Sequence, residues 1–359
     1  MIKPTSDRPS ASGDRSVAAT NVDGITSTGD GAIIVAQQTF GVSYRDARSI
    51  AIDVFNENFE RLKGDALRLA QERAEKITDD FLRRLQDTYP EAVNNFNQPG
   101  MQRALYRAQE AAACSEDGDL DDVLVDVLVE RAKEGGASLQ RVVLDEALQT
   151  IPKLTAVQIN ALSLIFYVRY TRSVAPPYET ALRVLSFEMM RHVEALQPIA
   201  SSDVALRHLA YAGCLSISMG AANIGKILSG LYFGVFSRGI NPHSVTTDMR
   251  PAFREFPGNP GLLYCPVSDD DSLESYLDNL QMADEVESIK NILKASTLNE
   301  SEVVDKIVGQ EPRLRTVLSV WNGSPLKNAE LTSVGTAIGY TNLRLKSTFN
   351  APLSLWLSE

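Results

Sequence analysis

Residues Ser43–Leu85, SYRDARSIAIDVFNENFERLKGDALRLAQERAEKITDDFLRRL, decide the fold class of this chain. Apolar side chains recur in the first half at steps of three and four, which places them on one side of a helix. They are Ala47, Ile50, Ala51, Val54, Phe55, Phe59 and Leu62. After Gly64 a second seam of this kind runs through a highly charged segment, at Ala66, Ala70, Ala74, Ile77, Phe81 and Leu85. The pattern predicts a long helical hairpin.

Signals at the ends of this stretch agree with that interpretation. Ser43 and Asp46 have the spacing of a capping box, in which side-chain oxygens bond the free amides of a helix start. Tyr89-Pro90 marks the other end, because proline cannot continue a helix.

Amphipathic segments of the same kind continue through most of the chain. The most apolar one, Val157–Tyr170, follows the capping residue Thr155 and is too short to cross a bilayer, so we expect a central core helix. Residues 241–268 are rich in proline and glycine and predict an irregular loop. The apolar ending, 353–357, predicts a strand or an extended tail. The fold is therefore expected to be mainly α, with a multi-helix, bundle-like body.

The first 40 residues have a different character. Residues 1–11 are polar and predict a mobile tail. The steps Ser12-Gly13-Asp14 and Thr28-Gly29-Asp30 are each followed by a short β-prone run, which suggests a small solenoid-like stack of strands. Two interpretations stay open, a flexible leader and a strand-forming segment for oligomerisation or docking. In the second, the apolar contacts come from Val17, Val22, Ile25, Ile33 and Val35.

Composition bounds the organisation and the class of protein. The chain has 359 residues, 44% of them hydrophobic and 23% charged, as is usual for a soluble globular protein. We divide it into a tail (1–11), a β-rich leader (12–40), a helical hairpin (41–114), a helical core (115–240), and an irregular loop with a C-terminal helical part (241–359). A net charge of −11 argues against generic nucleic-acid binding.

Cysteine usage and the N-terminus indicate a cytoplasmic protein. Cys114, Cys214 and Cys265 are too few and too scattered for a disulfide framework or a structural zinc site. The first ten residues lack the apolar core of a signal peptide. We predict no metal site and no cofactor.

Two motifs come close to ligand-binding loops. Gly220–Lys226 has the glycine and lysine positions of a phosphate-binding loop, but Ile227 replaces the hydroxyl residue that binds the metal. We therefore favour a helix whose glycines allow close packing. The acidic run 117–122 starts like a calcium loop but has Asp122 where glycine is needed, so a solvated helix entry is expected.

Two functional alternatives depend on other segments. If the protein is a hydrolase or nuclease, its chemistry falls to the 241–271 loop, where His243, Asp248 and Arg250 are the candidate catalytic residues. If it disrupts membranes, the segment 209–236 is the one that inserts, because Lys226 is its only full charge.

Three segments resemble a known family. They are Ser43–Leu62, Leu154–Arg172 and Leu331–Lys346, and they are similar to the uncharacterised bacterial LPO/Vpar-type hypothetical proteins. The leader SGDRSVAATNVDGITSTGDGA is similar to Gly-Asp leaders on bacterial conflict and anti-phage proteins. This resemblance implies a cytoplasmic defence component, an effector or an adaptor, and brings no catalytic residue with it.

The function predicted first is therefore non-enzymatic binding, to a second copy of the chain or to a protein partner of the same defence system. Contacts are expected from the leader and from the Ser43–Leu85 hairpin. The hairpin residues assigned to assembly are Ile50, Val54, Phe55, Phe59, Ile77 and Phe81.

Overall fold

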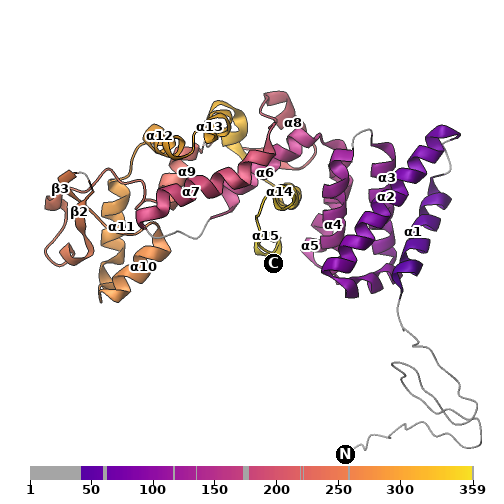
Figure 1. Cartoon of the computed structure of the whole chain (residues 1–359), viewed down its shortest axis with the longest axis horizontal. Helices are drawn as coiled ribbons and strands as arrows, with labels where there is room; N and C mark the ends of the chain where they lie inside the picture. Colours follow the sequence, from indigo (N-terminus) through magenta and orange to yellow (C-terminus); the bar gives the residue numbers. More distant parts are fainter. Residues whose placement is uncertain are drawn as a thin grey trace, which may run out of the picture.

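The computed structural model describes residues 42–59, 63–115, 118–134, 136–172, 178–218, 220, 222–257 and 259–357. The predicted tail and leader lie outside these residues. Within them the chain is mainly α-helical, as predicted, with a few short strands. Figure 1 shows helices α1–α5 at one end, α6 and α14 at the centre, and α10, α11 and the β2–β3 hairpin at the other end.

The helices at the first end begin with the predicted hairpin and add three more segments. Their bounds are α1 (Tyr44–Asn58), α2 (Asp65–Thr88), α3 (Pro99–Cys114), α4 (Asp121–Lys133) and α5 (Leu139–Thr150). The Ser43 cap is confirmed, because its hydroxyl accepts from the Asp46 amide at 3.1 Å while Asp46 bonds back to Ser43. Residues 90–97 form a 3₁₀-helix that buries Val93 and Phe96. Their three-residue spacing places both on one face of such a helix.

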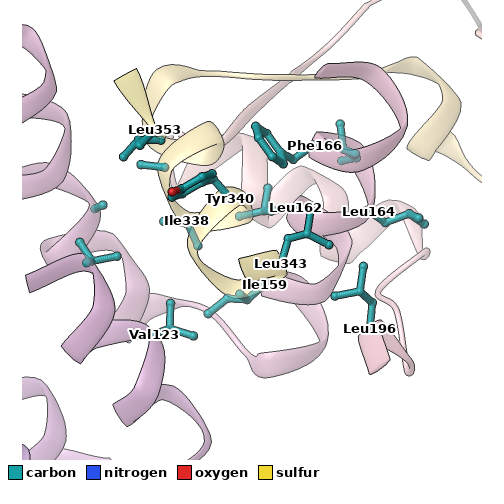
Figure 2. Packing of buried hydrophobic residues seen from close by; sticks show 14 of the residues in the cluster. Val123, Ile159, Leu162, Leu164, Phe166, Leu196, Ile338, Tyr340, Leu343 and Leu353 are labelled. Atoms are coloured by element: carbon teal, nitrogen blue, oxygen red, sulfur yellow. The ribbon is translucent and has the colours of Figure 1, made fainter. Parts of the chain in front are cut away.

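The centre of the molecule is built from α6 (Ala156–Tyr170) and α14 (Ser333–Lys346). The Thr155 cap of α6 is confirmed, with its hydroxyl accepting from the Gln158 amide. α14 packs along α6 and also contacts α4 and α5. In Figure 2, Ile338, Tyr340 and Leu343 of α14 lie among apolar side chains of α6. One core therefore crosses the boundaries predicted at residues 115 and 241.

Helices α7–α9, α12 and α13 extend from this centre, and a short sheet joins two distant segments. Strand β1 (Leu215–Ile217) pairs antiparallel with β4 (Ala329–Leu331), with Ser216 opposite Glu330. The helices are α7 (Tyr178–Val193), α8 (Asp203–Tyr211), α9 (Ile224–Leu231), α12 (Glu300–Gln310) and α13 (Leu314–Gly323). The apolar segment 209–236 is thus divided among α8, β1 and α9. In the described part of the chain, no helix has the length and apolar character that a membrane crossing requires.

The proline- and glycine-rich stretch is more ordered than expected. It contains the antiparallel hairpin β2 (Arg254–Phe256) and β3 (Asn259–Tyr264), which covers α10 (Asp270–Asn279) and α11 (Val286–Ala295). Phe253, Leu263 and Leu273 belong to a separate apolar cluster formed by this hairpin and these helices. Burial of these side chains explains why the segment is ordered despite its composition.

The apolar ending is a short helix, α15 (Ser354–Leu357), so the prediction of a strand or an extended tail is wrong. Trp356 fixes this helix against α6: its indole Nε1 donates to the Tyr170 carbonyl at 2.8 Å, and its ring packs edge-on to Phe166 with centroids 4.9 Å apart. A half-buried indole gains from such a hydrogen-bond partner, and a single turn of helix places Trp356 next to one.

A buried ionic network also connects α14 to the first helices. Arg344 of α14 donates to Asp126 at 2.8 Å and to Glu130 at 2.6 Å, and Arg84 of α2 donates to the second oxygen of Asp126 at 2.6 Å. Asp126 and Glu130 lie one turn apart on α4, and both carboxylates are buried. Their charges require partners, so the network fixes the position of α4 between α2 and α14.

We expect Gly339→Ala to destabilise the fold. A Cβ at Gly339 would lie 2.7 Å from the backbone oxygen of Leu162 in α6, and backbone cannot move aside cheaply. The expected loss is about 1–3 kcal/mol in the free energy of unfolding, measured by urea denaturation. Gly309→Ala in α12 is the matched control, because no atom of the described residues lies within 4 Å of a Cβ at that position and alanine favours a helix. Equal effects of the two substitutions would contradict close packing of α14 on α6.

Arg344→Gln should cost about 3 kcal/mol of unfolding free energy, because it leaves two buried carboxylates with fewer partners. The control is Arg68→Gln, which removes an exposed pair with Glu72 one turn away and should cost about 0.5 kcal/mol or less. Urea denaturation of both variants measures the difference. A loss as small as that of the control would show that the network does not hold α4 against α14.

Candidate functional site

The three candidate catalytic residues of the 241–271 loop all lie on the surface. His243, Asp248 and Arg250 are exposed, and no hydrogen bond or ion pair joins them among the described residues. The His243 amide donates to the side chain of Asn241, and the Arg250 guanidinium donates to the Phe253 carbonyl at 3.0 Å. These bonds hold the loop backbone and do not orient an acid and a base toward one point.

The hairpin residues assigned to assembly divide into two groups. Phe55, Ile77 and Phe81 are buried inside the chain, where α1, α2 and α3 pack together. Ile50, Val54 and Phe59 are half-buried. Folding of one chain therefore already uses the largest side chains of these seams. The five apolar leader residues assigned to assembly lie outside the described residues: Val17, Val22, Ile25, Ile33 and Val35.

The Gly220–Lys226 motif follows strand β1 and enters α9, as a phosphate-binding loop would. Two of the described amides at the start of α9 are already bonded: Ile224 donates to the Asn322 side chain at 3.1 Å and Gly225 to the Asn223 side chain at 2.8 Å. A Cβ at Gly225 would lie 2.2 Å from the Glu300 carbonyl oxygen. The glycine therefore permits close packing of α9 against the start of α12, as expected.

Ser347, from the end of α14, lies beside a histidine and a glutamate that are one turn apart on α7. His192 is 8% exposed, with Nδ1 3.1 Å from the Ser347 hydroxyl and Nε2 3.8 Å from Glu188. His192 and Glu188 line a cavity of about 330 Å³. This resembles the nucleophile, base and acid of a hydrolase in composition.

The hydrogen bonds rule out that role in this geometry. Ser347 donates its hydroxyl hydrogen to the Leu343 carbonyl at 2.8 Å and accepts from the Phe349 amide. It can therefore only accept from His192, which must carry its hydrogen on Nδ1 and cannot remove a proton from the serine. Burial lowers the pKa of His192, although the Glu188 charge opposes the shift. These three residues therefore have a structural role, because the hydrogen bond between His192 and Ser347 connects α7 to the end of α14.

A second cavity, of about 520 Å³, opens between α3, α4 and the end of α5. Its wall combines apolar side chains with charges of both signs, Arg107, Glu110 and Lys153, and with the exposed thiol of Cys114. Only the fold reveals this cavity, because its walls come from three separate helices. Its mixed lining does not select one chemistry.

The exposed apolar side chains of α8 are the surface feature best suited to binding another molecule. Val204 is 78% exposed and Tyr211 is 91% exposed, and their seven-residue spacing places them on the same side of α8. Leu206 and Leu209 are buried on the opposite side. In the next element, Ile217 of β1 is also exposed, at 44%. We call Val204, Tyr211 and Ile217 the α8 face.

Local contacts hold this face rigidly. The Ser202 hydroxyl caps α8 by accepting from the Ala205 amide at 3.2 Å. Gln158 of α6 donates to the Ala205 carbonyl at 3.1 Å and lies 3.0 Å from a ring nitrogen of His208. β1 pairs with β4 along one edge, and no described strand pairs with its other edge. A fixed apolar surface beside an open strand edge is suited to contact with another chain.

The prediction that assembly contacts come from the leader and the Ser43–Leu85 hairpin did not include the α8 face, and the reason is physical. In sequence, Val204 and Tyr211 look like parts of an apolar segment, and only the position of α8 at the periphery leaves them in solvent. Exposure of a large aromatic is informative because most large apolar side chains of a folded chain find a place in the core.

Comparison with known proteins gives one match. A protein-family model with the description ":-like" matches residues 41–357, a span that begins just before α1 and ends with α15. Residues 1–40 lie outside the match. No curated protein and no solved structure matches the chain. The family's description names no activity, ligand or partner.

The lowered pKa of His192 predicts a loss of stability on acidification. Neutral His192 is preferred in the folded chain, while the unfolded side chain takes up a proton below about pH 6.5. The stabilisation is therefore complete above that pH and is lost as pH falls through and below it, by at most about 1.4 kcal/mol per pH unit. Unfolding free energies at several pH values should fall less steeply for His192→Asn than for the parent. His243→Asn, in the exposed loop, is the comparison for loss of a histidine elsewhere; parallel curves for His192→Asn and the parent would contradict the assignment.

Proposed function

The chain belongs to the family whose model matches residues 41–357, and we propose that it is a non-enzymatic helical protein that acts by binding another protein chain. In this proposal the α8 face is the contact surface, and the occupant is a second copy of the chain. The protein serves as an effector or adaptor of a bacterial anti-phage system in the cytoplasm.

The observation that carries the proposal is the exposure of Val204 and Tyr211 on one side of a helix that is rigidly held from the other side. Tyrosine is enriched among the residues that dominate binding energy in protein interfaces, because its large ring is stiff and its hydroxyl tolerates water. Arg207 lies between the two residues in sequence, exposed and paired with Asp203 of the same helix. The face therefore offers an apolar contact with a charged margin, as interfaces do.

Self-association suits this surface because a twofold axis brings the same patch of both copies together. Such an axis would place α8 against α8 and bring the open edges of the two β1 strands near each other. The half-buried hairpin residues Ile50 and Val54 and the leader remain candidate secondary contacts. A heterologous partner from the same system is the other occupant that the test distinguishes.

The cellular context comes from sequence resemblance. The leader, residues 12–32, is similar to Gly-Asp leaders of bacterial conflict proteins, and the three resembling segments fall on α1, α6 and α14. The three cysteines are free thiols, which supports a reducing compartment. These points support a cytoplasmic defence role and name no trigger.

The test is the native mass of the full chain at micromolar concentration, by light scattering after size exclusion. We expect an oligomer for the parent protein and a monomer for the double variant Val204→Asp/Tyr211→Asp, because a buried charge on each copy opposes association. Leu355→Asp on α15 is the control, since Leu355 is 66% exposed and lies outside the face. Deletion of residues 1–40 measures how much the leader contributes to association. A monomeric parent protein, or a double variant that still associates, would overturn the proposal.

A further inference from the structure

The start of α3 is a helix N-terminus whose positive end has no local compensation. Proline 99 occupies the first position and Gly100 the second, the Gln98 side chain makes no capping bond, and the first turn contains no acidic residue. The first amides of a helix lack intrahelical acceptors and carry a partial positive charge. By itself this is a common feature, and three further observations distinguish it.

The first is a buried arginine with an unused donor. Arg131 of α4 is 2% exposed, and its Nε donates to Asp145 at 2.7 Å, while Nη1 reaches the Glu134 carbonyl at 3.5 Å. Its Nη2 is buried and has no hydrogen-bond partner among the described residues. An unpaired buried guanidinium nitrogen is costly, so such an atom calls for an acceptor.

The second observation is where this nitrogen lies. Nη2 of Arg131 is 3.4 Å from the point that a Cβ on Gly100 would occupy, and Nη2 of Arg141 is 2.8 Å from the same point. Two guanidinium groups from α4 and α5 therefore converge on the second residue of α3. Because Gly100 has no side chain, the tips of both arginines lie close to the backbone at the start of α3.

The third observation is the balance of charge. Among the described residues, Asp145 is the carboxylate that pairs with both arginines, bonding Arg131 at 2.7 Å and lying 4.0 Å from Nε of Arg141. Nη1 of Arg141 donates to the Gly136 carbonyl at 3.3 Å and adds no negative charge. One positive charge thus remains uncompensated, next to the positive end of α3 and inside a partly buried site where water screens it weakly.

We propose that Gly100, Arg131 and Arg141 form a binding site for a phosphate-type oxyanion. The Gly100 amide, Nη2 of Arg131 and Nη2 of Arg141 supply donors from three helices, and a tetrahedral oxyanion has enough oxygens to accept from all three. Gly100 and Arg141 are half-buried, whereas Arg131 is 2% exposed. The phosphoryl group is either free phosphate or part of a small phosphomonoester.

This site is independent of the α8 face, which lies on other helices. The bound anion would join α3, α4 and α5, because each contributes one donor. Binding of the anion would therefore stabilise the folded bundle, and the stabilisation would increase with the fraction of sites occupied.

The direct experiment is calorimetric titration of the full chain with inorganic phosphate, with adenosine monophosphate and with acetate, at low and at high salt. We expect saturable binding of phosphate that weakens with salt and exceeds the binding of acetate. Tighter binding of the monophosphate identifies an ester as the ligand, and equal binding identifies free phosphate. Absence of saturable binding by both phosphates, or preference for acetate, overturns the proposal.

Two variants test the residues without removing the buried Arg131. Arg141→Gln should weaken phosphate binding about tenfold, equivalent to about 1.4 kcal/mol. Arg315→Gln is the matched control, because it removes the same charge from an exposed arginine of α13. Gly100→Asp places a carboxylate beside the two guanidinium groups, so it should abolish phosphate binding while raising the melting temperature. If Arg141→Gln binds as the control does, or if Gly100→Asp lowers the melting temperature and still binds phosphate, the site is refuted.

Discussion

The packing of α14 on α6 is the constraint on which the rest of the structure depends. Gly339 lets the two backbones approach where a Cβ would meet the Leu162 carbonyl, and Gly335 does the same against the Cys214 carbonyl just before β1. When α14 is packed on α6, strand β4 lies beside β1 and pairs with it. The following helix α15 then packs against the end of α6, where Trp356 donates to the Tyr170 carbonyl. Small residues thus allow contact between segments that are remote in sequence, and dispersion forces act fully at that distance.

Polar side chains in the same interface determine its register. The Asn342 amide donates to Ser163 at 2.7 Å and to Asn160 at 3.2 Å, and Lys346 donates to Asn160 at 2.8 Å. A shift of α14 by one residue would leave these groups without partners inside the core, at a cost that apolar contacts alone do not impose. The glycines therefore permit the approach, and the amides select one alignment.

Local signals in the sequence were sufficient for the first hairpin and the central helix α6, including the starts of α1 and α6. Ser43, Thr155 and the seams of the hairpin act through neighbours three or four residues away, so pattern alone identifies them. The 3₁₀-helix at 90–97, the β2–β3 hairpin and the helical ending depend on burial against distant segments. Periodicity carries no information about such partners.

The same distinction applies to the surfaces with which this chain meets other molecules. His243 stands out in sequence by its chemistry, yet the fold leaves it in solvent. Tyr211 and Arg131 are inconspicuous in sequence, because exposure of the first and convergence of the second on Gly100 exist only after helices have packed. Residue type predicts what a side chain can do, and tertiary structure determines whether it is placed to do it.

The central position of α14 also has a consequence for biosynthesis. Asn342 joins Asn160 across 182 positions of the chain, so the ribosome has made α6 long before its covering helix appears. Until then, the apolar side chains of α6 that α14 buries remain open to water and to other nascent chains. The first five helices can gather early, but the centre can close only after translation has passed residue 346. A product that stops short of α14 would expose this surface and become a substrate for chaperones and proteases.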